Sequence, residues 1–134
     1  MATWKAFEDI EAWQDARSLC KSVYSIFQHQ GAKNDFALRD QMVRSSGSIM
    51  DNIAEGFERN GRKEFIQFLS IAKASCGEVR SQLYRCLDRE YIDQSEFEQL
   101  MQKSLEAGKK IGGLIRYLKT SEYKGSKFSE SEYE

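Results

Sequence analysis

Residues 63–90 read KEFIQFLSIAKASCGEVRSQLYRCLDRE and carry the most regular apolar pattern in the chain. At 100° per residue the apolar side chains fall on one narrow stripe, made of Phe65, Phe68, Leu69, Ala72, Cys76, Val79, Leu83, Cys86 and Leu87. Their three- and four-residue spacing is that of the a and d positions of helices that pack side by side. The stretch therefore predicts a long helix that buries one seam against neighbouring helices.

Three further segments, residues 9–29, 36–58 and 94–119, show the same period. The chain contains no proline, which suits long uninterrupted helices, and it lacks the alternating Val, Ile and Thr runs that predict strands. Because the connections are short, successive helices should run antiparallel. We therefore predict an all-α, up-down antiparallel four-helix bundle as a single domain over residues 1–119, followed by a mobile polar tail over residues 120–134.

Turn residues mark the expected ends of these helices. Gly31 suits the C-terminal cap of the first helix. Asn34 or Asp35 can cap the second helix by accepting a hydrogen bond from a free backbone N–H. Asp93, followed three residues later by Glu96, resembles a capping box at the start of the last helix.

The amino-acid composition excludes several classes of protein. The 134 residues are 40% hydrophobic and 31% charged, which is typical of one globular domain. The 20 Lys and Arg residues nearly balance the 21 Asp and Glu residues, whereas a strongly basic nucleic-acid binder would show an excess of cations. No apolar run approaches the roughly 18 residues that span a membrane, and the first residues do not resemble a signal peptide. We expect a cytoplasmic protein with no membrane partner.

Residues that could bind a metal or support catalysis are scarce. His29 is the only histidine, and Cys20, Cys76 and Cys86 are widely spaced with no C-x-x-C pair, so no metal site is expected. We interpret the cysteines as small buried hydrophobic residues in a reducing compartment. The glycines follow no predicted strand, so no phosphate loop is expected. The sequence predicts no catalytic residue and no cofactor.

The second predicted helix carries an unusual polar stripe. Four small or amide-bearing residues and one carboxylate follow one another at spacings of four, three, four and three, namely Gln41, Ser45, Ser48, Asn52 and Glu55. One interpretation is a polar packing seam, either between helices or between subunits. The alternatives are an ordinary solvated flank, or a catalytic acid or base at Glu55, which would need a second titratable group and a nucleophile nearby.

The last predicted helix contains Gly108, Gly112 and Gly113. Each glycine in a helix interior costs up to about 1 kcal/mol relative to alanine, so three of them suggest that helix backbones approach closely there. Gly108 and Gly112 have the G-x-x-x-G spacing, and we include both in the predicted packing stripe. The alternative is that the glycines are merely tolerated on a lightly packed helix.

Two groups of basic residues are candidates for contact with RNA or DNA. One group lies in the second loop and the other on the last helix, and together they comprise Arg59, Arg62, Lys63, Lys109, Lys110 and Arg116. The alternative is a solvated charged face, because acidic residues are interleaved almost everywhere else.

The apolar arcs of the first two helices are unusually broad, at about 160°. A four-helix bundle buries only a seam on each helix. The surplus apolar width therefore predicts a second buried surface, which argues for self-association.

Four stretches resemble a known family: FEDIEAWQDA at 7–16, LRDQMVR at 38–44, SIMDNIAEGF at 48–57 and KEFIQFLSIAKAS at 63–75. They are similar to the four-helix bundle proteins of the 23S rRNA intervening-sequence type, which are related to the accessory proteins of diversity-generating retroelements. The similarity covers roughly residues 7–119.

This resemblance implies a bacterial up-down bundle that assembles into a ring-shaped homopentamer and has no enzymatic activity. The retroelement relatives bind nucleic acid and a reverse transcriptase through a basic ring. The chain departs from the family pattern at Met50, where proline is common, and in its near-neutral charge. The leading hypothesis is a non-enzymatic homopentameric scaffold. The alternative is an RNA- or DNA-binding accessory protein that acts with an rRNA insert or a reverse transcriptase.

Overall fold

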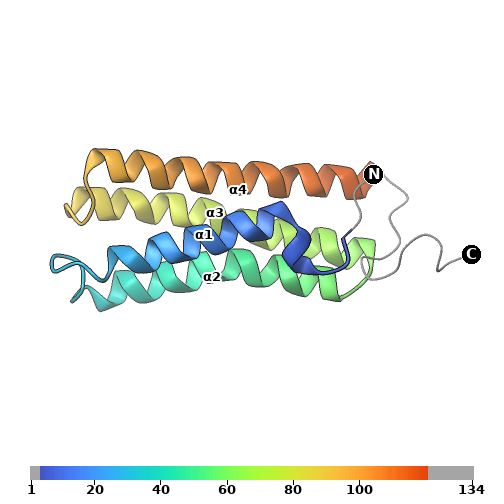
Figure 1. Ribbon diagram of the computed structural model, residues 1–134, viewed down its shortest axis with the longest axis horizontal. Helices are drawn as coiled ribbons and strands as arrows, with labels where there is room; N and C mark the ends of the chain where they lie inside the picture. The colour runs from blue at the N-terminus through green and yellow to red at the C-terminus, as the bar shows by residue number, and fades with distance from the viewer. Residues whose placement is uncertain (1–3, 121–134) are drawn as a thin grey trace, which may run out of the picture.

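The computed structural model describes residues 4–120, and Figure 1 shows them as an up-down antiparallel four-helix bundle. This confirms the predicted all-α fold. A short 3₁₀-helix precedes the four long helices, and the elements in order are η1 (Phe7–Asp9), α1 (Glu11–Ile26), α2 (Phe36–Glu58), α3 (Arg62–Asp88) and α4 (Gln94–Thr120).

Each helix packs against the helices that precede and follow it in the chain, and α1 closes the bundle against α4. The segment between α1 and α2 and the turn between α3 and α4 lie at one end of the bundle, while η1 lies toward the other end (Figure 1). Within residues 4–120, none of the helices combines the length and the apolarity that crossing a lipid bilayer requires.

The apolar stripes of the four helices meet in one continuous core. Its largest fully buried side chains include Leu19 of α1, Phe57 of α2, Leu83 of α3 and Ile111 of α4. Phe57 packs edge-to-face on Phe65, with ring centroids 6.1 Å apart. Loss of such side chains typically costs several kcal/mol, so this core supplies most of the stability that holds the helix surfaces in place.

The first helix is shorter than predicted, since α1 ends at Ile26 and not at residue 29. The backbone amides of Phe27, Gln28 and His29 bond to the third residue back, which is a tighter turn than the α-helix. Phe27 and Ala32 remain buried, so the apolar period continued into the turn and concealed the end of the helix. Gly31 does not have the positive φ expected of a C-terminal cap.

The third helix also ends earlier than predicted, at Asp88 and not at residue 90. Glu90 adopts a φ of 61°, and the Tyr91 amide donates to the Cys86 carbonyl at 2.9 Å, which closes the helix end. Thr120, assigned to the tail from sequence, is the last residue of α4. The mobile tail predicted for residues 121–134 lies outside the described residues.

The predicted N-terminal caps are confirmed. Asp35 accepts a hydrogen bond from the Leu38 amide at 3.2 Å at the start of α2. At the start of α4, the Glu96 amide donates to Asp93 at 2.8 Å while the Asp93 amide donates back to Glu96 at 3.0 Å.

Candidate interaction surfaces

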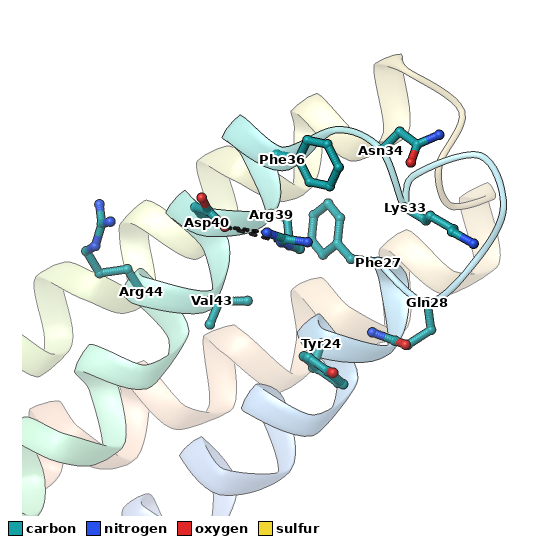
Figure 2. Close-up of a pocket in the computed structure, with 10 residues that line it drawn as sticks. All are labelled: Tyr24, Phe27, Gln28, Lys33, Asn34, Phe36, Arg39, Asp40, Val43 and Arg44. Atoms are coloured by element: carbon teal, nitrogen blue, oxygen red, sulfur yellow. Dashed lines mark hydrogen bonds and ion pairs between the residues drawn. The ribbon is translucent and has the colours of Figure 1, made fainter.

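A groove of about 810 Å³ opens between α1 and α2 at the end of the bundle where the two helices are joined (Figure 2). Residues from both helices and from their connection line it, namely Tyr24, Phe27, Gln28, Lys33, Asn34, Phe36, Arg39, Asp40, Val43 and Arg44. Tyr24, Phe36 and Val43 are 58%, 56% and 42% exposed, respectively. Three large apolar side chains therefore surround one open groove.

Arg39 connects the aromatic and charged parts of this groove. Its guanidinium lies 4.9 Å from the centroid of the Phe36 ring, and its Nε and Nη2 donate to Asp40 at 3.2 and 3.1 Å. The stacked cation and the carboxylate hold Phe36 at the rim of the groove. A planar aromatic surface with fixed polar neighbours is typical of interaction sites.

The apolar surface continues along α1 and α2 beyond the groove. The Cys20 thiol of α1 donates to the Met50 sulfur of α2 at 3.5 Å, and both side chains are half-buried. We call the surface formed by Cys20, Tyr24, Phe36, Val43 and Met50 the α1–α2 face. This face combines two flexible sulfur-bearing side chains with two exposed aromatic rings, a composition common in protein interfaces.

The structure places most of the predicted polar stripe between α2 and α3. As residue numbers rise along α2 they fall along α3, and three pairs bridge the helices, namely Arg85 to Gln41 at 2.9 Å, Ser45 to Gln82 at 2.6 Å and Ser75 to Ser48 at 3.0 Å. Ser45 and Gln82 are buried. We call these three pairs the α2–α3 seam.

Two members of the predicted stripe do not reach α3. Asn52 donates to the carbonyl and the hydroxyl of Ser48, one turn earlier in α2, at 2.8 and 2.9 Å. Glu55 is exposed and pairs with Arg59 at 3.1 Å. In this geometry Asn52 orients the Ser48 hydroxyl, and Glu55 is half of an exposed ion pair, whose contribution to stability is small.

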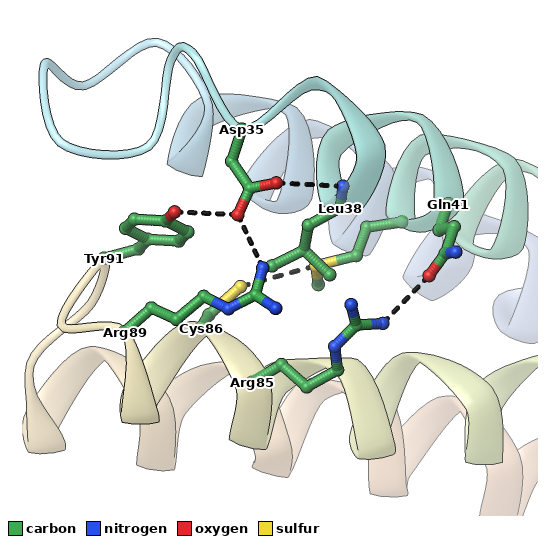
Figure 3. A network of polar contacts seen from close by, with 8 residues as sticks. Asp35, Leu38, Gln41, Arg85, Cys86, Arg89 and Tyr91 are labelled. Carbon is green, nitrogen blue, oxygen red and sulfur yellow. Dashed lines mark hydrogen bonds and ion pairs between the residues drawn. The ribbon is translucent and has the colours of Figure 1, made fainter.

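A second polar group joins the same helices near the groove end (Figure 3). Arg89 and Tyr91 both donate to one oxygen of Asp35, at 2.6 and 2.7 Å, while the other oxygen caps α2. The Tyr91 hydrogen bond lowers the pKa of the Asp35 carboxyl, and the Leu38 amide and Arg89 reinforce this direction against the opposing effect of burial. The same bond raises the pKa of Tyr91. Charge and capping together fix the start of α2.

The glycine that the packing requires is Gly56, which was not singled out from sequence. A Cβ on Gly56 would stand 2.7 Å from Phe68 Cβ and 3.4 Å from the Phe65 carbonyl oxygen. The predicted pair behaves differently, because a Cβ on Gly108 or on Gly112 would meet only neighbours at 3.5 Å or beyond. The close approach of backbones therefore lies between α2 and α3, at Gly56.

The structure separates the candidate nucleic-acid contacts into two kinds. Lys110 is engaged by Asp15 and Glu11 of α1 at 2.8 and 3.2 Å. Arg59 is engaged by Glu55, and its guanidinium lies 5.2 Å from the centre of the Phe68 ring. Arg62 and Lys63 are exposed at the start of α3. Lys110 and Arg59 are thus held by the protein itself.

Arg116 has a different setting, on the surface shared by α3 and α4, whereas Lys109 is exposed on α4. Lys73 Cε and Arg116 Nη1 lie 3.5 and 3.6 Å from where a Cβ on Gly112 would stand, and Arg80 Nη1 lies 3.8 Å from the equivalent point on Gly108. No ion pair links Lys73, Arg80, Lys109 or Arg116 to any carboxylate among residues 4–120. We call Lys73, Arg80 and Arg116 the α3–α4 basic cluster.

The environment of the cysteines is that of core residues and differs from that of reactive thiols. Burial raises the pKa of the Cys76 and Cys86 thiols to about 11, and it also raises the pKa of Cys20. Cys86 donates to the Met42 sulfur at 3.4 Å inside the core. Over the described part of the chain, no three His, Cys, Asp or Glu side chains gather where they could hold a metal ion.

The family model described as 23S rRNA-intervening sequence protein matches residues 8–113. The chain belongs to this family. Residues 8–113 run from η1 to within the last two turns of α4, so the range matched by the 23S rRNA-intervening sequence protein family contains the residues of both the α1–α2 face and the α2–α3 seam. The predicted resemblance is confirmed.

One solved relative shares the fold of this member of the 23S rRNA-intervening sequence protein family. It is a protein of unknown function from the S23 ribosomal protein family of Bacteroides thetaiotaomicron, with 24% sequence identity and a TM-score of 0.71. The match covers 78% of this chain and 98% of the other. At this identity the likeness shows the shared bundle alone. No curated protein matches the chain.

Three groups of residues in these surfaces were not predicted from the sequence. The α3 partners of the seam, Gln82 and Arg85, look like ordinary polar residues of a helix until α2 is placed beside them. Lys73 and Arg80 resemble a solvated charged face. Gly56 lies inside the quoted stretch at 48–57, and its position one turn after Asn52 on the seam side was the available signal.

Proposed function

We propose that this family member is a non-enzymatic homo-oligomeric scaffold, a pentamer, whose subunits associate through the α1–α2 face. The observation that carries the proposal is the exposure of Tyr24, Phe36 and Val43 around one groove. Large apolar side chains gathered on a monomer surface typically mark a surface that a partner covers. The partner is a second copy of the chain.

The rest of the bundle is consistent with a scaffold role. The α2–α3 seam and the cap at Asp35 fix α2 against α3, so the α2 half of the α1–α2 face lies on a helix that is held in place. Helix faces that change little on binding lose little conformational entropy when they associate. Such a surface suits a permanent assembly.

A pair of charge substitutions tests this face directly. Tyr24→Glu combined with Phe36→Glu should convert the oligomer to a single chain, because each would place a carboxylate in a desolvated contact. Sedimentation velocity gives the assembly state, and circular dichroism should report unchanged helicity, since both positions are exposed in the isolated chain.

Leu105→Glu is the matched control, because Leu105 is 46% exposed but lies on α4, away from the α1–α2 face. It should leave the assembly intact. An oligomer that survives the double substitution, or that is lost equally with Leu105→Glu, contradicts the assignment of the interface.

The second candidate function is binding of RNA or DNA, and the α3–α4 basic cluster favours it. Three cations without carboxylate partners in the described structure lie beside Gly108 and Gly112, where a phosphate backbone could approach closely. A near-neutral total charge is compatible with this local group of cations.

Replacing Lys73, Arg80 and Arg116 together by alanine should weaken binding of a structured RNA at low salt. The slope of log affinity against log salt should become shallower by about 2 to 3, at about 0.7 per lost contact on single strands and about 0.9 on a duplex. Fluorescence anisotropy over a salt series measures both quantities. Arg59→Ala is the control and should leave the slope unchanged, because Arg59 is held by Glu55. Absence of binding by the unmodified protein at low salt removes this candidate.

A further inference from the structure

The groove between α1 and α2 contains charged side chains that a purely apolar partner surface would leave without ion-pair partners. Three cations line it, Lys33, Arg39 and Arg44, whereas its lining contains one carboxylate, Asp40, which Arg39 already binds. The groove therefore offers aromatic rings together with surplus positive charge. Its complement is an extended segment that carries aromatic side chains and carboxylates.

The chain itself contains such a segment beyond α4. Residues 128–134 read FSESEYE, with two aromatic residues, Phe128 and Tyr133, and three glutamates, Glu130, Glu132 and Glu134. The glutamates alternate along the segment, so an extended backbone would direct all three to one side. No Lys or Arg interrupts them, in contrast to residues 121–127, which contain two lysines.

We propose that residues 128–134 of a neighbouring copy occupy the α1–α2 groove of each subunit. This deepens, and rests on, the proposed self-association. The aromatic side chains of the segment pack against Tyr24 and Phe36, and its glutamates lie near Arg39 and Arg44. The assembly is thereby held by a helix face and by an exchanged peptide segment.

The geometry of the bundle favours the segment of a neighbour over that of the same chain. Thr120 ends α4 at the opposite end of the bundle from the groove (Figure 1). The 23 residues of α2 span about 34 Å. About eleven residues separate Thr120 from the middle of the segment and span about 36 Å when fully extended, so the chain's own segment would have to stretch almost fully. A neighbour whose α4 ends closer to the groove would not require this extension.

The affinity of the segment for the groove should come from the many copies present in one assembly, more than from any single ion pair. Arg44 and Lys33 are exposed, so each ion pair that they form contributes little and is weakened by salt. Once subunits associate, every segment is held near a groove at high effective concentration. The segment should therefore increase the stability of the oligomer, whereas the α1–α2 face alone is sufficient for the subunits to associate.

Photo-crosslinking of the full-length chain tests the proposal. Tyr133→p-benzoyl-L-phenylalanine places a reactive group on the segment, and mass spectrometry of digested products locates its attachment. We expect crosslinks between two chains that map to Tyr24, Phe36 or Val43, together with a two-chain band on a denaturing gel. Glu130→Gln, Glu132→Gln and Glu134→Gln combined should lower the crosslinked yield several-fold, whereas Glu122→Gln should not.

The outcomes separate this proposal from the proposed function. The segment exchange is wrong if the oligomer is intact but the crosslinks stay within one chain, map away from the groove, or do not form. These outcomes leave the proposed oligomer unaffected. The segment exchange is also wrong if the crosslinked yield stays the same after the three glutamate-to-glutamine substitutions. If light scattering of the same sample reports a single chain, both the exchange and the proposed function are wrong.

Discussion

Gly56→Ala should lower the free energy of unfolding by about 2 kcal/mol, although alanine is the better helix former by about 1 kcal/mol. The added Cβ would stand 2.7 Å from Phe68 Cβ and 3.1 Å from a ring carbon of Phe65. The Phe68 Cβ is fixed to its backbone, so it can retreat only if α2 and α3 move apart. Their separation would loosen the α2–α3 seam along its length.

Urea unfolding followed by circular dichroism measures this effect, and Gly77→Ala provides the control. Gly77 lies inside α3, and a Cβ there would meet only the end of the Arg80 side chain, at 3.7 Å. Gly77→Ala should therefore stabilise the bundle slightly. A Gly56→Ala protein that is as stable as the unmodified chain would show that the helices do not approach each other this closely.

Ser45→Ala should lower the free energy of unfolding by about 1–2 kcal/mol, because it leaves the buried Gln82 oxygen without its 2.6 Å hydrogen bond. Gln82→Leu should cost less than this. The Ser45 hydroxyl then retains the Met42 carbonyl as an acceptor, 3.3 Å away in the same helix. The two substitutions therefore have unequal expected effects, although they remove the same hydrogen bond.

The double variant completes the cycle. With both polar groups gone, Ser45→Ala and Gln82→Leu together should be close to the unmodified chain in stability, so the coupling energy should equal the sum of the two single losses, about 2 kcal/mol. Denaturant unfolding of all four proteins provides the values. Additive losses would mean that Ser45 and Gln82 stabilise the bundle independently, and the seam would then be an incidental contact.

The sequence was sufficient to predict the four helices because apolar periodicity is a local property of each segment. Its errors arose where burial continued past the end of a helix. Phe27 and Ala32 are as buried as helical residues, so the pattern ran on into the turn after Ile26. Glu90 ended α3 with a positive φ that is uncommon for its residue type, and nothing in the sequence marks it.

The interaction surfaces were predictable only in part, since each depends on two helices. The stripe from Gln41 to Asn52 was visible because it lies on one helix, whereas the α3 side of the seam had no pattern of its own. Lys110 and Lys109 are neighbours in sequence and look equivalent. The bundle turns Lys110 toward the carboxylates of α1 and leaves Lys109 exposed.

A native mass measurement of the full-length chain at micromolar concentration tests the proposed scaffold most directly. The chain has a mass of 15.5 kDa, and the proposed pentamer predicts a principal species of five times that mass. Tyr24→Glu with Phe36→Glu should return the mass to that of one chain. A principal species of 15.5 kDa for the unmodified protein would contradict both the pentamer and the role assigned to the α1–α2 face.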